Sequence, residues 1–376
     1  MADISPDNNV AANQSRRNGI AIVGTVGVPG RYGGFETLAE NIVHYHSRHD
    51  RTEPLAVYCS LRDGSQARPD RFQSATLRYV ALDANGPQSI AYDMVSLFDC
   101  VRRRDGHILI LGVSGTIALP IVRLISNARI TTNIDGIEWK RAKWTGVARL
   151  ILKISEWFAV RFSHNVVADN QAIADYVHDR YKQPCTVIAY GGDHALEFPP
   201  DPDLALSLPD KYALALCRIE PENNAHLILE AWQRVPLPLV FVGNWENSAY
   251  GRDLKARFVG LPGIHLVDPV YDPGVLRAIR ERATVYIHGH SAGGTNPSLV
   301  EMMHFGIPVV AHGCQFNRFT TDDRALYFET SDDIVDAMSR IVDEASSAIG
   351  PAMRALARER YMWDRIGEQY FELLSS

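Results

Sequence analysis

Short runs of β-branched and apolar residues alternate with helix-length amphipathic segments from Gly19 to the C-terminus. This alternation is typical of right-handed βαβ units around a parallel sheet. Seven runs come first, at 19–24, 54–59, 77–82, 107–111, 129–133, 164–169 and 186–190. Six more follow, at 212–217, 239–243, 264–267, 284–289, 307–312 and 325–329. We therefore expect an α/β protein with two Rossmann-like domains.

The stretch 191–210 between the two series is rich in Gly, Pro and Asp and has no sustained period, which favours a domain boundary there. We expect a disordered arm at 1–18, an N-terminal Rossmann-like domain at 19–190, a C-terminal one at 191–355, and a C-terminal helix at 356–376. Open parallel sheets bind ligands beyond the carboxyl ends of their strands. The two domains are thus expected to face each other across a cleft.

Composition and charge narrow the classes of function. The chain has a net charge of −6 and five widely spaced cysteines, so neither a broad nucleic-acid-binding surface nor a disulfide framework is expected. The N-terminus lacks the apolar core of a signal sequence. The apolar, uncharged stretch 107–122 is too short for a membrane span. We expect a cytoplasmic protein without nucleic-acid partners.

A glycine-rich loop, GTVGVPGRYGGFETLAE, follows the first expected strand. Glycine lets a backbone approach a ligand closely, and a helix starting near Gly34 would point free N–H groups at it. With Arg31 beside them, Gly33 and Gly34 are predicted to cradle a phosphate. The loop fits neither the dinucleotide fingerprint nor the P-loop. A turn that merely closes the sheet is the alternative.

Two further turns at expected strand ends carry polar residues. The turn 112–116 contains Ser114, and Asp135, Glu138 and Trp139 follow the strand 129–133. These groups would reach the same edge of the sheet. Alternatively, the first turn simply joins strand to helix, Glu138 pairs with Lys140 or Arg141, or the two carboxylates form a hydrolase pair.

The most informative stretch is TVYIHGHSAGGTNPSLVEMMHFGIPVVAH, at 284–312. A strand ends near His288, a turn exposes glycines 293 and 294, and Pro297 suits the first turn of a helix carrying Glu301. Backbone amides of this turn could hold a diphosphate while Glu301 binds a ribose hydroxyl. Arg218, which follows the strand 212–217, would point to the same place. His288 and His290 could instead be packed histidines; no usual trio of metal ligands surrounds them.

These motifs resemble the retaining, two-Rossmann-domain (GT-B type) glycosyltransferases of glycosyltransferase family 4. GTVGVPGRYGGFETLAE, NIDGIEWKRAKW, RIEPENN and HGHSAGGTNPSLVEMM are more closely similar to bacterial rhamnosyltransferases of capsule, exopolysaccharide and O-antigen synthesis. The resemblance covers the chain after residue 18. It implies a nucleotide-sugar donor on the second domain, an acceptor on the first, and a C-terminal helix that crosses back to the first domain.

The resemblance also implies roles for single residues. Glu301 matches the second of the family's two glutamates, but Gly293 stands at the first; Arg218 matches a diphosphate-binding arginine, but Asn223 stands where the family has lysine. Sugar contacts would then come from backbone amides or from His290. The implied catalytic residues are Arg218, Glu301, Asp135 and His290. The implied donor-binding residues are Gly33, Gly34, Arg31, Gly293, Gly294, Thr295, Asn296 and Asn223, and the acceptor-side residues are Glu138, Trp139 and Ser114.

The mechanism implied for such enzymes keeps the reaction on one face of the sugar, and the departing phosphate oxygen receives the acceptor proton. The protein then supplies positioning and stabilisation of negative charge. No DxD motif follows a strand, so we expect neither a cofactor nor an essential metal. The implied donor is dTDP-L-rhamnose, with a UDP- or GDP-hexose as the alternative.

The expected acceptor is a polyprenyl-diphosphate-linked saccharide at the inner face of the cytoplasmic membrane. Between Lys140 and Arg161 the sequence interleaves six cations with aromatic and aliphatic residues and has one acid, Glu156. Such a helix can lie in the headgroup region of an anionic membrane, so peripheral membrane contact is predicted. The alternative is an ordinary Rossmann helix with solvated cations.

Two other classes of function remain open at this point. One is a cleft enzyme with different sugar chemistry: a phosphorylase, a hydrolase or a sugar-nucleotide epimerase. The other is a non-catalytic nucleotide-sugar-binding subunit, which the departures at Gly293 and Asn223 make conceivable. Donor turnover measured with and without acceptor would separate them.

Overall fold

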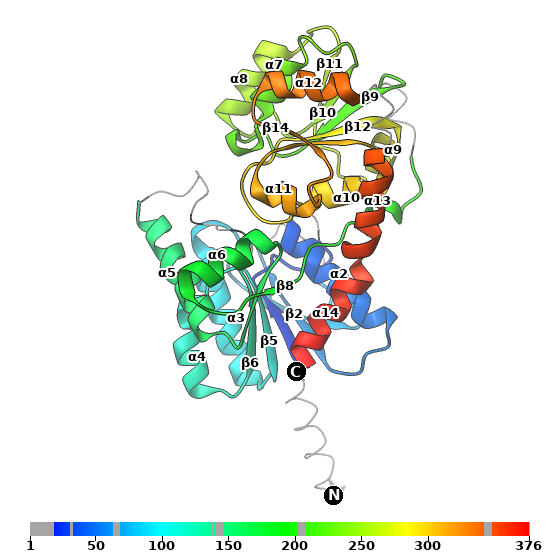
Figure 1. The fold of residues 1–376 in the computed structure, drawn as a ribbon. Helices are drawn as coiled ribbons and strands as arrows, with labels where there is room; N and C mark the ends of the chain where they lie inside the picture. Colours follow the sequence, from blue (N-terminus) through cyan, green and yellow to red (C-terminus); the bar gives the residue numbers. More distant parts are fainter. Residues whose placement is uncertain are drawn as a thin grey trace, which may run out of the picture. The chain divides into compact units, whose positions relative to one another are not determined.

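The computed structural model of the protein describes residues 19–30, 33–62, 68–134, 136, 139, 146–201, 208–341 and 348–375. The chain divides into two compact units (Figure 1). The first contains the chain up to Ile188 together with Asp364–Ser376, and the second is Ala189–Trp363. The division thus falls just before the Gly- and Pro-rich stretch, and the chain leaves the second unit at the first residue of its last helix.

The first unit is built on an eight-stranded sheet in the order β3-β4-β2-β1-β5-β6-β7-β8. All neighbours pair in parallel except β3 with β4. The strands are β1 (Ile20–Val23), β2 (Leu55–Ser60), β3 (Arg71–Phe72), β4 (Ala75–Val80), β5 (His107–Leu111), β6 (Arg129–Asn133), β7 (Asn165–Ala168) and β8 (Thr186–Val187). The central strands β1 and β2 are buried along their whole length, because helices cover both faces of a parallel sheet.

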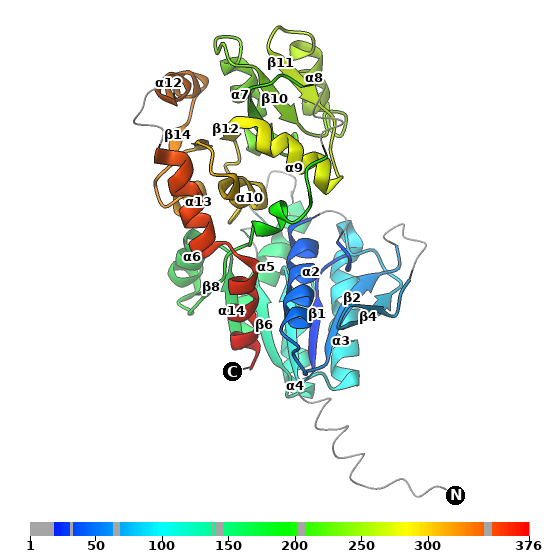
Figure 2. The ribbon, with the colours of Figure 1, turned by 90° about the vertical axis from the view of Figure 1, so that its right-hand side faces the viewer.

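Helices lie on both faces of this sheet. In Figure 2, α2 and α14 are on the near face of the first unit, and α3 and α4 lie behind the strands. The helices are α2 (Gly34–Arg48), α3 (Ser89–Arg103), α4 (Leu119–Ile125), α5 (Gly146–Phe162), α6 (Gln171–Tyr181) and α14 (Trp363–Ser375), with short 3-10 turns η1 (Gly86–Gln88) and η2 (Thr116–Ala118).

The second unit has a six-stranded parallel sheet in the order β11-β10-β9-β12-β13-β14. Its strands are β9 (Tyr212–Leu216), β10 (Leu239–Val242), β11 (Ile264–Val267), β12 (Ala283–His288), β13 (Val309–His312) and β14 (Leu326–Phe328). Its helices are α7 (Ala225–Ala231), α8 (Ala249–Phe258), α9 (Pro273–Arg282), α10 (Pro297–Phe305), α11 (Gln315–Thr320), α12 (Ser331–Ile341) and α13 (Ile349–Arg360), with 3-10 turns η4 (Asp193–Leu196) and η6 (Pro221–Asn223).

Strand order reverses once in each sheet. In the first unit, β1 leads outward to β2 on one side and β5 leads to β6 on the other. In the second, β9 leads to β10 and β12 leads to β13. Ligands of open α/β sheets bind beyond the carboxyl ends of the strands at such a reversal. A ligand site is therefore expected at the turns after β1, β5, β9 and β12.

The last helix, α14, belongs to the first unit. The Tyr370 hydroxyl accepts a hydrogen bond from Asn133 Nδ2 at 2.7 Å, and the Phe371 ring stacks on Tyr45 with centroids 5.6 Å apart. A Cβ on Gly367 would lie 2.3 Å from Tyr45 Cγ, so glycine is required where α14 approaches α2. The aromatics of this segment are buried.

The predicted fold class is confirmed: the chain has two Rossmann-like α/β units, and its C-terminal helix crosses back to the first. Each expected strand is present. β3, a two-residue antiparallel strand, was missed because so short a run has no readable period. No helix among the described residues combines the length and the apolar composition of a membrane span.

Candidate functional site

The candidate site lies at the strand-order reversal of the second unit. β9 and β12 pair in parallel, with Tyr286 opposite Leu214. Arg218 follows β9 by two residues, and His290 follows β12 by two. Both turns therefore leave the sheet at the same edge. Helix α10, which carries Glu301, begins at Pro297, in the first-turn position that the sequence indicated.

Arg218 presents a cation to solvent at this edge. Its side chain is 45% exposed, and Nη1 lies 3.9 Å from Glu220 Oε1. The buried Asn223 fixes the turn, because its Nδ2 donates to the backbone oxygen of Arg218 at 2.7 Å. A weakly paired guanidinium on a fixed turn can grip a phosphate. Asn223 is a structural residue here and supplies no charge.

Asn223 also holds His290. Its Oδ1 is hydrogen bonded to His290 Nδ1, which requires that nitrogen to carry the proton, because an amide oxygen only accepts. The ring thus takes a defined orientation. His290 Nε2 lies 3.0 Å from where a Cβ on Gly293 would be, and Gly293 has φ +114. The His290 ring therefore borders the space of a side chain at 293, and backbone strain excludes most residues there.

Glu301 is buried and ionised between two partners. The Arg280 guanidinium donates to Oε2, and His194 Nε2 lies 3.3 Å from Oε1. Burial alone would raise the pKa of Glu301, but Arg280 and His194 together hold it below its usual value. Trp363 Nε1 donates to His194 Nδ1 at 2.8 Å. This bond leaves the proton of neutral His194 on Nε2, facing Glu301.

His288 is packed in the core of the same unit. Burial, with smaller contributions from His290 and His312, lowers its pKa well below the usual range. Nδ1 lies 3.2 Å from the Tyr286 hydroxyl, while Nε2 has no hydrogen-bond partner among the described residues. The interpretation as a packed neutral histidine agrees with this placement.

The residues before α10 form its N-terminus. Asn296 caps the helix: its Oδ1 accepts from the backbone N–H of Ser298 at 3.1 Å and from the Ser298 hydroxyl at 2.8 Å. Thr295 is buried, and Gly293 and Gly294 lie in the turn before it. The positive end of the helix dipole at this N-terminus favours an anionic ligand.

Two carboxylates of α2 lie against the glycine loop of the first unit. Glu36 Oε1 accepts from the backbone N–H of Val26 at 2.9 Å, and Glu40 Oε2 accepts from that of Gly30 at 2.8 Å. A Cβ on Gly33, at φ +127, would lie 2.0 Å from Glu36 Oε2. Two carboxylates thus bind other amides of the loop, and their charge favours hydroxyl ligands over a dianion. The phosphate-binding role of Gly33 and Gly34 stays a prediction.

The other predicted site residues of the first unit are only partly described by the structure. Asp135, Glu138 and Arg31 lie outside the described residues. Ser114 is half-buried in the turn after β5. Trp139 Nε1 donates a hydrogen bond to the buried Glu156 of α5 at 3.0 Å. Glu156 also accepts from the hydroxyls of Tyr176, at 2.7 Å, and Tyr181.

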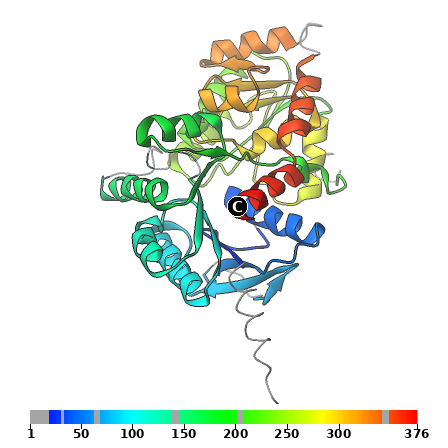
Figure 3. The ribbon, with the colours of Figure 1, turned by 60° about the horizontal axis from the view of Figure 1, so that its bottom comes forward.

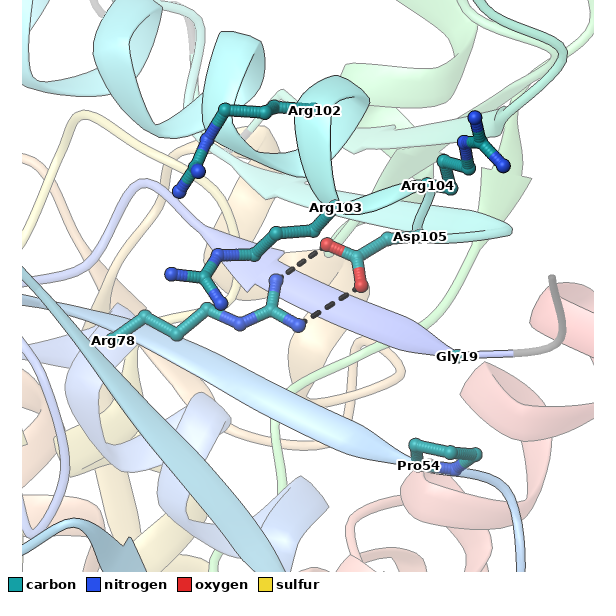
Figure 4. A pocket seen from close by; sticks show the side chains of 7 residues that line it. All are labelled: Gly19, Pro54, Arg78, Arg102, Arg103, Arg104 and Asp105. Carbon is teal, nitrogen blue, oxygen red and sulfur yellow. Dashed lines mark hydrogen bonds and ion pairs between the residues drawn. The ribbon is translucent and has the colours of Figure 1, made fainter. Parts of the chain in front are cut away.

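A cavity of 530 Å³ lies elsewhere, at the amino-terminal edge of the first sheet (Figure 4). It is lined by Gly19, Pro54, Arg78, Arg102, Arg103, Arg104 and Asp105. Arg78 binds Asp105 with two hydrogen bonds, and Arg102 and Arg103 both bind Asp99. Most of the charged side chains that line this cavity thus have an ionic partner, and none of the predicted site residues lines it. The reaction is therefore not assigned to this cavity.

Metal ligands are not grouped in the part of the chain that the structure describes: no three of its His, Cys, Asp and Glu side chains converge. That the reaction needs no metal stays a prediction. The residues that the sequence missed are Glu36, Glu40, His194 and Arg280. Each contacts a partner on another element or turn of the fold. No sequence motif identifies these contacts.

Comparison with protein families gives two matches along the chain. Residues 17–193 match a domain of unknown function, DUF1972, and residues 210–344 match the model described as Glycosyl transferases group 1. The second unit contains a glycosyltransferase domain. The matched residues include Arg218, Asn223, His290 and Glu301, but not His194 or Trp363. No curated protein matches the chain in sequence.

Solved structures of the GT-B fold align with nearly the whole chain. Sucrose-phosphate synthase from Thermosynechococcus elongatus aligns with a TM-score of 0.77 at 15% identity, over 94% of this chain and 97% of that one. Anabaena HepE in complex with UDP-glucose aligns with a TM-score of 0.68 at 16% identity, over 95% and 99%. A glycosyltransferase from Rickettsia africae aligns with a TM-score of 0.70 at 10% identity, over 94% and 97%.

Proposed function

We propose that this protein is a retaining glycosyltransferase that moves L-rhamnose from dTDP-L-rhamnose to a polyprenyl-diphosphate-linked saccharide in capsule, exopolysaccharide or O-antigen synthesis. The observation that carries the transferase proposal is the edge between β9 and β12. The turns after these strands carry an exposed Arg218 and an oriented His290, and the following helix α10 carries Glu301, all within the residues that match the Glycosyl transferases group 1 model. The sugar, the acceptor and the pathway rest on the sequence resemblance.

In this proposal the diphosphate binds between Arg218 and the N-terminus of α10. Arg218 stabilises charge on the leaving diphosphate, and Glu301 accepts a hydrogen bond from the sugar ring of the nucleoside. A deoxyribose offers only its 3′-hydroxyl for that bond. The departing phosphate oxygen takes the acceptor proton, so the protein needs no separate base. Preorganised cations and amides suit that task.

His290 is proposed to contact the donor sugar, in place of the glutamate that the family carries where this chain has Gly293. Asn223 orients the ring, and Nε2 borders the Gly293 turn. His290→Ala should therefore weaken binding of the nucleotide sugar and leave the affinity for the free nucleotide within about twofold. Equal weakening of both ligands would contradict a sugar contact.

A UDP-hexose is the second candidate donor. HepE has been solved with UDP-glucose, and its fold matches that of this chain.

Turnover of a donor panel tests the proposal. dTDP-L-rhamnose, UDP-glucose and GDP-mannose are each incubated with and without a polyprenyl-diphosphate-linked saccharide, and release of nucleoside diphosphate is measured. We expect acceptor-dependent consumption of dTDP-L-rhamnose. Consumption without acceptor would indicate a hydrolase, and binding without turnover a non-catalytic subunit. Consumption of UDP-glucose or GDP-mannose but not dTDP-L-rhamnose would overturn the assigned sugar.

A further inference from the structure

Helix α5 exposes a continuous apolar stripe. Val147, Leu150, Ile154 and Trp157 are 73%, 56%, 39% and 46% exposed. Their spacing of three, four and three residues places them on one side of the helix. The opposite side is buried through Leu152, Ser155, Glu156, Ala159 and Val160. The helix therefore has an apolar side in the core and a second apolar side in solvent.

A matching stripe runs along η2 and α4. Ile117, Ile121, Leu124 and Ile125 are 38%, 52%, 85% and 55% exposed. Ala118, Leu119 and Val122 face the core instead. Leu124 is the most exposed large apolar side chain among the described residues. Side chains this exposed on η2 and α4 do not contribute to the core of the first unit.

The two stripes lie beside each other. Thr116 Oγ1 donates to the backbone oxygen of Ser155 at 2.6 Å, and Arg123 Nη1 donates to that of Phe162 at 3.1 Å. Figures 1 and 3 show α4 and α5 on the outer side of the first unit. We call the surface formed by Ile117, Ile121, Leu124, Ile125, Val147, Leu150, Ile154 and Trp157 the α4–α5 face. Large exposed apolar surfaces generally mark interaction sites.

The exposed charged side chains of α4 and α5 have one sign. Arg123, Arg149, Lys153 and Arg161 are exposed on the same two helices. The one acid in residues 117–125 and 146–162 is Glu156, and it is buried beneath hydrogen bonds from Trp139 and two tyrosines. The face thus offers apolar side chains and cations, with its acid withdrawn into the core.

We propose that the α4–α5 face docks on an anionic lipid bilayer. The apolar side chains enter the boundary between headgroups and acyl chains, and the four cations meet lipid phosphates. This inference deepens the proposed function, because the acceptor proposed there is lipid-linked. The helices run back along the strands, so the first turn of α5 starts at the carboxyl edge of the sheet. Docking would bring that edge to the membrane surface.

Vesicle sedimentation of the full chain tests the proposal without any turnover. Vesicles contain phosphatidylcholine with phosphatidylglycerol. The double variant Leu124→Ser/Leu150→Ser should lower the partition coefficient about tenfold or more, because each leucine contributes transfer free energy when inserted. The matched control Val259→Ser/Leu261→Ser removes exposed apolar side chains from the second unit and should change it less than about twofold. An unchanged melting temperature shows that the variants remain folded.

Salt separates the two contributions to binding. Arg149→Ser/Arg161→Ser should weaken binding at low salt and have little effect at high salt, where charges are screened. The leucine variant should weaken binding at both. Equal vesicle binding by wild type and leucine variant would overturn the proposal. A lower mass of the leucine variant than of the wild type in solution would also overturn it, because the face would then be a contact between copies of the chain. Either result leaves donor turnover, and thus the proposed function, untouched.

Discussion

His194 Nε2 lies 3.3 Å from Oε1 of Glu301 and, with Arg280 on the other oxygen, fixes the carboxylate within the second unit. Trp363 Nε1, which donates to His194 Nδ1, sets the tautomer that makes this possible. The second unit thus holds an ionised carboxylate in a buried position. Such a group accepts hydrogen bonds strongly once a ligand hydroxyl reaches it.

Arg280→Met should destabilise the protein strongly. Arg280 is buried, and its loss leaves the Glu301 carboxylate without its main counter-charge. Removal of one partner from a buried ion pair costs about 3–5 kcal/mol of unfolding free energy. Arg234→Met, which breaks an exposed pair with Asp332, is the control and should cost about 1 kcal/mol or less. Urea unfolding measures both, and equal losses would contradict the account.

Arg218→Ala should reduce turnover and leave stability nearly unchanged. The side chain is 45% exposed and weakly paired, so little packing is lost. A preorganised cation at the leaving group contributes about 100- to 1000-fold to kcat. Steady-state kinetics on the best donor, compared with the melting temperature, checks this. A variant with wild-type rates would show that the site is assigned to the wrong residue.

Stability should fall with rising pH because of Asp93. Burial raises the pKa of this carboxyl from 3.8 to about 8, although the Gly115 backbone N–H donates to it and opposes the shift. The folded state keeps the proton that the unfolded chain releases, so this contribution is complete below about pH 4 and is lost as pH rises to about 8. The loss approaches ~1 kcal/mol per pH unit.

Asp93→Asn removes this titration and keeps the size of the side chain. Urea unfolding of the wild type between pH 5 and pH 8 should show a slope that the variant lacks. Parallel curves for both proteins would mean that Asp93 is ionised in the folded state.

Nucleotide binding should raise the melting temperature selectively. A ligand at about a hundred times its dissociation constant adds about 2.7 kcal/mol to the unfolding free energy. Thermal shifts against dTDP, UDP, GDP and ADP should be largest for dTDP, and Glu301→Gln should reduce that shift. A largest shift with UDP would favour a UDP-hexose donor.

The fold was predictable because each parallel strand is buried on both faces and therefore reads as an apolar run. β1 and β9, for example, are almost wholly apolar and end at glycine or polar turns. The turn positions of Arg218 and Pro297 follow from the same pattern. The partners of Glu301 do not, since Arg280 comes from α9 and His194 from η4.

The partners of the glycine loop could not be predicted from the sequence either. Its glycines indicate close backbone approach, but the sequence does not say what approaches. Glu36 and Glu40 lie one and two turns into α2 and fold back onto the loop amides of Val26 and Gly30. Side-chain direction at a helix start depends on the path of the preceding loop, which spacing does not reveal.

The anomeric configuration of the product tests the central claim most directly. The donor selected by the panel is turned over with a polyprenyl-diphosphate-linked saccharide, and the new glycosidic bond is assigned by proton NMR. Same-face transfer at the edge of β9 and β12 predicts that the bond keeps the configuration of the donor, and that Arg218→Ala slows its formation about 100- to 1000-fold. An inverted bond, or undiminished product from Arg218→Ala, would contradict the account.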